Sequence, residues 1–146
     1  MMNIPIEDVY EQIRQIAEKF EQFSRHLQVL RRADKEDITN EFIISGVIDK
    51  FYIQFELGWK VLKELLSYEG VKSAASGSPR EIIKAAYAYF DFIDENLWLQ
   101  MLRDRNDTTH MYNEAAAVEL VDKIIKDYIP LFEKMEKAVK DRYEEQ

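Results

Sequence analysis

The residues best suited to chemistry lie in one polar segment, residues 105–112, which reads Arg-Asn-Asp-Thr-Thr-His-Met-Tyr. Histidine exchanges a proton near neutral pH, and the guanidinium of Arg105 can bind a phosphate through two parallel hydrogen bonds. If they are exposed, the side chains of Arg105, Asn106, His110 and Tyr112 could share one cleft. Such a cleft would suit proton transfer and charge stabilisation at a phosphodiester.

The spacing of Arg105 and His110 restricts this interpretation. On a continuous helix, side chains five residues apart point about 140° away from each other. The two groups would converge only if the helix ends or distorts near residues 107–109, where Asp and Thr side chains compete for backbone hydrogen bonds. In the alternative interpretation the segment is only a helix-ending turn, and Arg105 and His110 cap backbone carbonyls. The spacing alone leaves both alternatives open.

Other candidate sites are weaker. We expect His26, which lies off the apolar face of its helix beside Arg25, to be solvated and without a role. Asp107 and His110 have a helical metal-ligand spacing, but a bundle metal site needs a second such motif, so we predict no metal. A Gly-rich phosphate loop and the paired aspartates of a nucleotidyltransferase are also lacking, so we predict no bound cofactor and no transferase chemistry in this chain.

Composition favours one helical domain. The 146 residues include four Gly and three Pro, with 47% hydrophobic and 33% charged residues, which is typical of long helices. We expect a single domain over residues 1–146. The chain has no cysteine and no long apolar stretch, which predicts a cytoplasmic protein without membrane segments. A net charge of −8 opposes non-specific binding to nucleic acid, so RNA chemistry would need a local basic cleft.

The first half of the chain predicts two long helices. Apolar residues recur at alternating spacings of three and four from Ile6 to Leu30, on a helix opened by Pro5. Thr39 or Asp37 could cap a second helix that runs to Gly70. Its predicted inward face consists of Ile44, Val47, Ile48, Phe51, Phe55, Leu62 and Leu65, and Gly58 and Trp59 are expected to set a close approach between helices.

The second half completes the bundle. Residues 78–81 form a capping box that starts a third helix, and a shorter segment carrying Trp98 follows it. Asn113 can cap the last helix, which we expect to kink at Pro130. We therefore predict an all-α, antiparallel up-and-down four-helix bundle with an extra short helix. The narrow stripe from Ile6 to Leu30 is also compatible with burial in a homodimer.

Four motifs together resemble a known family. They are Phe51-x-x-x-Phe55-Glu56-Leu57-x-Trp59-Lys60, Ser78-Pro79-Arg80-Glu81, Trp98-Leu99-x-Met101-Leu102 and Arg105-Asn106-x-x-x-His110-x-Tyr112. In order and spacing they resemble the nucleotidyltransferase substrate-binding proteins of the HEPN superfamily. The resemblance covers nearly the whole chain. It implies a HEPN-type bundle, usually a homodimer, encoded beside a minimal nucleotidyltransferase that would be its partner.

The resemblance also implies roles for residues. Many HEPN proteins are metal-independent endoribonucleases, in which the matching positions, here Arg105, Asn106 and His110, are catalytic. In toxin members the partner enzyme attaches AMP to a tyrosine at the position of Tyr112 and silences the nuclease. Two such motifs facing each other across a dimer axis would supply both acid and base.

Two departures from the family pattern concern the neighbouring surface. Tyr52 stands where many members have an acidic residue, and Phe90 where a glycine is frequent. We expect neither side chain to contact the Arg-His motif, although both could change partner specificity. The resemblance leaves two functions open: a toxin-like endoribonuclease that binds RNA, or a non-catalytic subunit that uses the same residues to bind a nucleotide or present a substrate to the transferase.

Overall fold

The computed structural model describes residues 5–74 and 76–143, and the regular elements in these ranges are all helices. The α-helices are α1 (Ile6–Leu30), α2 (Glu41–Tyr68), α3 (Pro79–Tyr89), α4 (Glu95–Asn106), α5 (Glu114–Lys123) and α6 (Ile129–Tyr143). Short 3-10 turns follow α1, α2 and α4. The predicted all-α class is confirmed.

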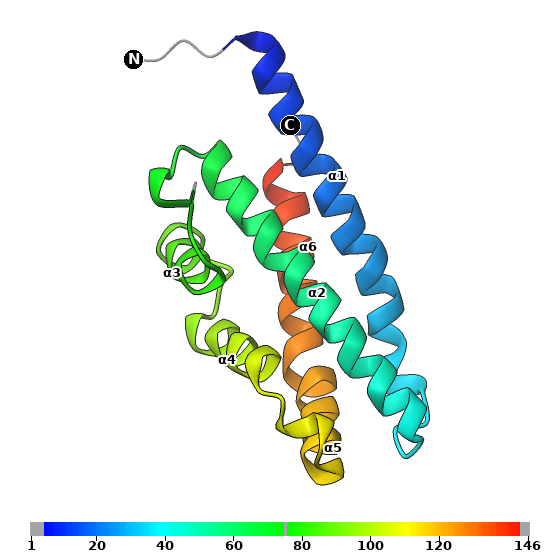
Figure 1. Ribbon diagram of the computed structural model, residues 1–146. Coiled ribbons are helices and arrows are strands. Elements are labelled where there is room, and N and C mark those ends of the chain that lie inside the picture. Colours follow the sequence, from blue (N-terminus) through cyan, green and yellow to red (C-terminus); the bar gives the residue numbers. More distant parts are fainter. Residues whose placement is uncertain (1–4, 75, 144–146) are drawn as a thin grey trace.

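The helices form a bundle around α2. In Figure 1, α1, α2 and the α5–α6 pair are the long rods, and α3 and α4 lie beside α2 on the side away from α1. Helix α1 contacts α2 and α6, whereas α2 also contacts α3, α4 and α5. The region predicted as a third helix plus a shorter segment consists of α3, with 11 residues, and α4, with 12. The predicted helical bundle is therefore present.

Side-chain caps start most of these helices, as expected from their sequences. Ser78 caps α3 with Pro79 in the first turn, Asn113 caps α5, and Gly70 follows α2 with a positive φ of 85°. The predicted cap of α2 was wrong. Asn40 takes this role, because its Oδ1 accepts hydrogen bonds from the backbone N–H groups of residues 42 and 43. Asp37 instead holds Thr39 in the preceding turn.

The distortion expected near Pro130 takes the form of a π-helical turn. This turn, Ile124–Tyr128, joins α5 to α6 and ends immediately before the residue that precedes the proline. Proline has no N–H to donate to the preceding turn, so a wider turn at this point accommodates the missing bond. Tyr128 within the π-helical turn is fully buried. The distortion therefore directs a large side chain into the core.

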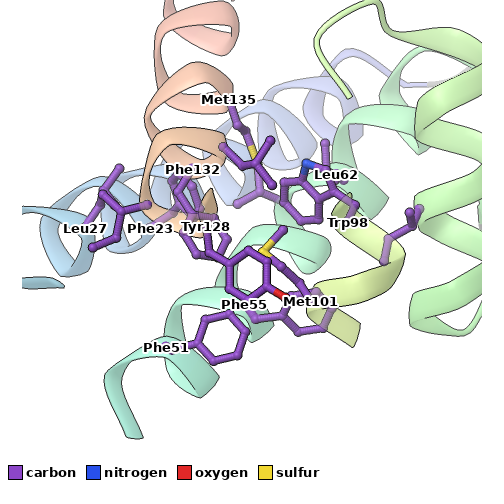
Figure 2. Packing of buried hydrophobic residues seen from close by; sticks show 14 of the residues in the cluster. Phe23, Leu27, Phe51, Phe55, Leu62, Trp98, Met101, Tyr128, Phe132 and Met135 are labelled. Atoms are coloured by element: carbon purple, nitrogen blue, oxygen red, sulfur yellow. The ribbon is translucent and has the colours of Figure 1, made fainter. Parts of the chain in front are cut away.

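Aromatic side chains fill the centre of the bundle, as Figure 2 shows. The rings of Trp98 and Phe132 meet edge to face with centroids 5.8 Å apart, and Phe23 meets Phe132 in the same way at 6.0 Å. Gly58 lies against this cluster. A Cβ atom there would stand 3.2 Å from Cε2 of Phe23 and 3.4 Å from Cη2 of Trp98. The predicted close approach at Gly58 is thus confirmed.

The apolar stripe of α1 is only half covered. Its second half is buried, with Phe20, Phe23, Leu27 and Leu30 in the core. In the first half, Ile6 is 68% and Ile13 is 42% exposed. The covered and uncovered halves meet at a groove of about 620 Å³, whose lining includes apolar side chains of α1, α2 and α6. Figure 1 shows the start of α1 extending beyond the neighbouring helices.

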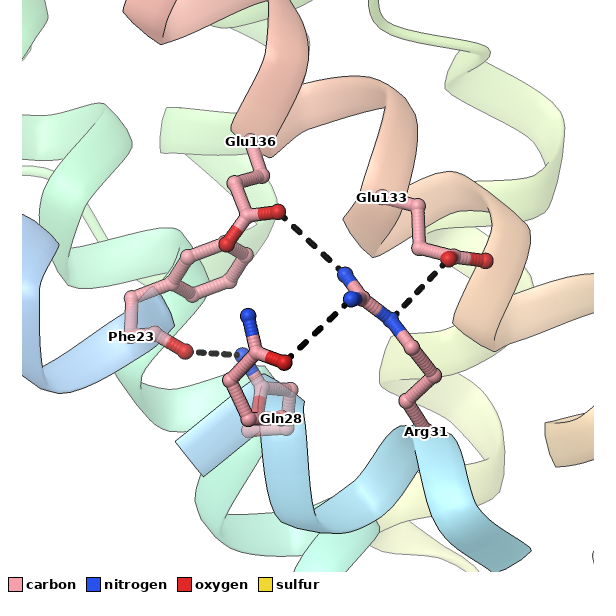
Figure 3. A network of polar contacts seen from close by, with 6 residues as sticks. Phe23, Gln28, Arg31, Glu133 and Glu136 are labelled. Carbon is pink, nitrogen blue, oxygen red and sulfur yellow. Dashed lines mark hydrogen bonds and ion pairs between the residues drawn. The ribbon is translucent and has the colours of Figure 1, made fainter. Parts of the chain in front are cut away.

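A charged network joins the end of α1 to α6. Arg31 forms ion pairs with Glu133 at 3.1 Å and with Glu136 at 3.3 Å, and it also donates to Gln28 at 3.4 Å (Figure 3). Glu136 is nearly buried, whereas Arg31 is partly exposed. Since an unpaired carboxylate would be costly at that depth, Arg31 fixes the packing of α6 against the end of α1.

The expectation that His26 is a solvated surface side chain was wrong. His26 is partly buried, and its Nδ1 lies 2.7 Å from Oε1 of Gln54, an acceptor that is itself fully buried on α2. Nε2 of Gln54 donates in turn to the carbonyl oxygen of Phe23 at 3.0 Å. A buried amide needs partners for both of its ends. His26 therefore has a structural role, as the partner of Gln54.

Candidate functional site

The segment that carries the chemical residues begins where α4 ends. Helix α4 stops at Asn106, and a 3-10 turn, Thr109–Met111, follows it. The carboxylate of Asp107 accepts hydrogen bonds from the backbone N–H of Thr109 at 2.9 Å and from its hydroxyl at 2.7 Å. This local competition for hydrogen bonds ends the helix at the predicted place. His110 is therefore no longer constrained by the helical repeat that contains Arg105.

Arg105 is held at the surface of α2. Its guanidinium pairs with the carboxylate of Glu56, and each of these side chains is about one-third exposed. The guanidinium carbon lies 5.9 Å above the ring centroid of Phe55, and Nη1 lies 3.4 Å from Oδ1 of Asn106. Asn106 itself is exposed. The charge of Arg105 is thus partly neutralised, while its remaining N–H groups stay near solvent.

His110 is held by Tyr52. The Nε2 atom of the imidazole lies 2.6 Å from the phenolic oxygen, and the two rings meet edge to face with centroids 5.7 Å apart. The expectation that Tyr52 does not contact the Arg-His motif was therefore wrong. Tyr52 and Glu56 are one turn apart on α2, a spacing that puts them on one face of the helix. Arg105 and His110 consequently meet α2 on the same face.

In the alternative interpretation of the sequence, Arg105 and His110 would only cap backbone carbonyls at a helix-ending turn. Among the hydrogen bonds of the described residues, both side chains bond to side chains of α2 or to a neighbouring amide, and neither bonds to a backbone carbonyl. The sequence contained one signal for these contacts, because Tyr52 and Glu56 lie four residues apart in a helical segment. That signal does not reveal which distant residues the helix face would meet.

The surroundings of Arg105 and His110 are mainly acidic. Burial raises the pKa of Tyr52, and the carboxylates of Asp49 and Asp107 raise it further, whereas Arg105 lowers it. Hydrogen bonds from the hydroxyl and backbone of Thr109 lower the pKa of Asp107, and His110 adds a smaller effect in the same direction. Near neutral pH, Tyr52 therefore keeps its proton and Asp107 is ionised.

Tyr112 follows the turn that carries His110, and it faces solvent. It closes the 3-10 turn, where its backbone N–H bonds to the carbonyl of Thr109 at 3.1 Å. Its side chain is 87% exposed, and the neighbouring Met111 is 65% exposed. The phenol is thus open to another protein and is not packed at the start of α5.

Within residues 5–74 and 76–143, no group of three or more His, Asp or Glu side chains is placed to hold a metal ion. In the same ranges, no helix combines the length and the apolar character that crossing a membrane requires.

Comparison with known proteins identifies the family. No curated protein matches the sequence. A family model described as "Nucleotidyltransferase substrate binding protein like" matches residues 12–141, a range that includes Tyr52, Glu56, Arg105, His110 and Tyr112. The chain belongs to the family of nucleotidyltransferase substrate-binding-like proteins.

Proposed function

We propose that this chain is the partner of a minimal nucleotidyltransferase encoded nearby, that it cleaves RNA without a metal ion, and that AMP transfer to Tyr112 silences it. One observation carries the proposal: Arg105 and His110 meet the same face of α2, and Tyr112 is exposed in the turn that follows. Membership of the family supports the association with a nucleotidyltransferase.

The cleavage would use the 2′-oxygen of a ribose as the nucleophile. That oxygen attacks the adjacent phosphorus, and the bond from phosphorus to the 5′-oxygen breaks. His110 would take the proton of the 2′-hydroxyl or give a proton to the departing 5′-oxygen. Arg105 would stabilise the charge that develops on the phosphorane, and Asn106 would orient His110 or the phosphate.

AMP transfer to Tyr112 would block this site. The transferase would join the phenolic oxygen to the α-phosphate of ATP and release pyrophosphate. The product carries a bulky anion two residues from His110, within the same turn. This anion would pair with Arg105, the cation that should bind the scissile phosphate. The nuclease would therefore be inhibited because its cleft is occupied.

The acceptor can be tested directly. We expect incubation with the cognate transferase, ATP and Mg²⁺ to add one AMP to the wild-type chain and none to Tyr112→Phe, as measured by intact mass. Tyr10→Phe is the matched control, because Tyr10 is also a largely exposed phenol but lies on α1. AMP transfer that persists undiminished in Tyr112→Phe would assign the acceptor to another residue.

We also propose a homodimer formed through the uncovered half of α1. Ile6 and Ile13 belong to the exposed half of the apolar stripe, and burial of such a stripe favours association. We expect sedimentation to show a dimer at micromolar concentration for the wild type and a monomer for Ile13→Glu. Val118→Glu, at an exposed position of α5, should stay dimeric. A stable wild-type monomer would contradict this proposal.

Such a dimer would not join the two sites. In Figure 1 the uncovered half of α1 and the end of α4 lie toward opposite ends of the bundle. Two chains paired through α1 would therefore keep their Arg-His motifs apart. Each motif would have to find its second proton-carrying group within its own chain or in the RNA, in contrast to the face-to-face arrangement expected from the resemblance.

A non-catalytic subunit is the second candidate, and the acidic surroundings favour it. Glu56 partly neutralises the charge of Arg105. The carboxylates of Asp49, Asp104 and Asp107 all raise the pKa of Tyr52. RNA binding normally requires a local surplus of Lys and Arg. If the purified chain binds the transferase but leaves RNA intact in every state of modification, the subunit role is the correct one.

A further inference from the structure

We propose that Tyr52 is a positioning residue for His110: its phenol donates to Nε2 of the uncharged imidazole, which places the ring proton on Nδ1 and leaves Nδ1 to meet the ligand. The contact deepens the proposed function, since a nuclease or a nucleotide-binding site would use the same oriented ring. Its geometry is a 2.6 Å separation between the phenolic oxygen and Nε2.

The two sides of this contact differ in rigidity. Tyr52 lies in the middle of α2, next to the fully buried Phe51, whose ring centroid lies 5.9 Å from that of Tyr52. His110 lies on a 3-10 turn of three residues, which is closed by local backbone bonds from Met111 and Tyr112. Short turns of this kind hold a side chain weakly. Tyr52 therefore supplies the fixed point, and His110 is the group that is oriented.

The phenol suits a histidine that changes its protonation state. Because burial and nearby carboxylates raise the pKa of Tyr52, its hydroxyl keeps its proton near neutral pH. It can then donate to an uncharged Nε2 and can accept from the same nitrogen when the ring is protonated. A carboxylate in its place could only accept. The contact therefore persists in both protonation states of the ring, and Nδ1, to which no described residue hydrogen-bonds, carries a proton that it can donate to a ligand in each state.

Nitrogen NMR of the imidazole rings tests the proposal on the isolated chain. At a pH where the rings are uncharged, we expect the ¹⁵N shifts of His110 to show the proton on Nδ1 in the wild type. In Tyr52→Phe the signal should move toward the Nε2-protonated form. His26 is the internal reference, because its Nδ1 donates to the amide oxygen of Gln54 and should be unaffected. Tyr68→Phe, on the exposed face of α2, is the matched control variant.

The outcomes separate this proposal from the proposed nuclease. A wild-type His110 that carries its proton on Nε2, or one whose tautomer is unchanged in Tyr52→Phe, would overturn it, and the first result requires no variant. If the chain cleaves RNA, Tyr52→Phe should lower kcat about tenfold, in the range seen when a supporting hydrogen bond is removed, while KM changes little. If the tautomer changes as expected but RNA stays intact, the positioning role stands and the nuclease proposal fails.

Discussion

Replacing His110 with alanine is expected to lower RNA cleavage at least about a hundredfold, the usual effect of removing a general acid or base. His110 is the residue to which we assign the proton transfer, since near neutral pH the neighbouring Asp107 is ionised and Tyr52 keeps its proton. Cleavage of a labelled RNA by the purified chain measures the effect. In cells, growth arrest caused by the wild-type chain should disappear with the variant.

Two controls make this result specific. Met111→Ala removes an exposed side chain from the same turn and should leave cleavage unchanged. Arg105→Lys keeps the charge but loses the planar pair of donors, so cleavage should fall although Glu56 keeps an ionic partner. Full cleavage by His110→Ala, or a complete loss of wild-type activity in EDTA, would rule out the metal-independent mechanism.

Replacing Gly58 with leucine is expected to lower the free energy of unfolding by about 3 kcal/mol or to prevent folding, because overpacking a dense core costs this much or more. Even a Cβ atom at Gly58 would stand 3.2 Å from Phe23 and 3.4 Å from Trp98, and both rings are fully buried. The added branches have no space unless the aromatic cluster moves. Urea denaturation followed by circular dichroism measures the change.

Gly46 provides the matched control on the same helix. A Cβ atom at Gly46 would meet nothing within 4 Å, so Gly46→Leu should stabilise α2 by roughly 0.5–1 kcal/mol through helix propensity alone. If the free energy of unfolding falls in Gly58→Leu and rises in Gly46→Leu, the limit on substitution at Gly58 is the lack of space and not a general effect of replacing glycine. Equal stability of the two variants would contradict the close approach at Gly58.

The sequence by itself determined the features that depend on local interactions. The Ser78 and Asn113 caps, the glycine that ends α2 and the apolar stripe of α1 follow from side-chain and backbone preferences within a few residues. The end of α4 near Asp107 is of the same kind, since a carboxylate and a threonine two residues apart compete with the helix. The α2 cap was missed because Asp37, Thr39 and Asn40 are all able to cap.

The tertiary structure alone decided which distant side chains meet. The pairing of His110 with Tyr52 spans 58 residues and that of Arg105 with Glu56 spans 49, so no local pattern could indicate either contact. The same holds for His26, which a helical pattern placed in solvent and which Gln54 of α2 binds. Helical periodicity states which face of a helix a residue occupies, whereas the packing of helices decides what that face touches. The chemistry of this site depends on the packing of the helices.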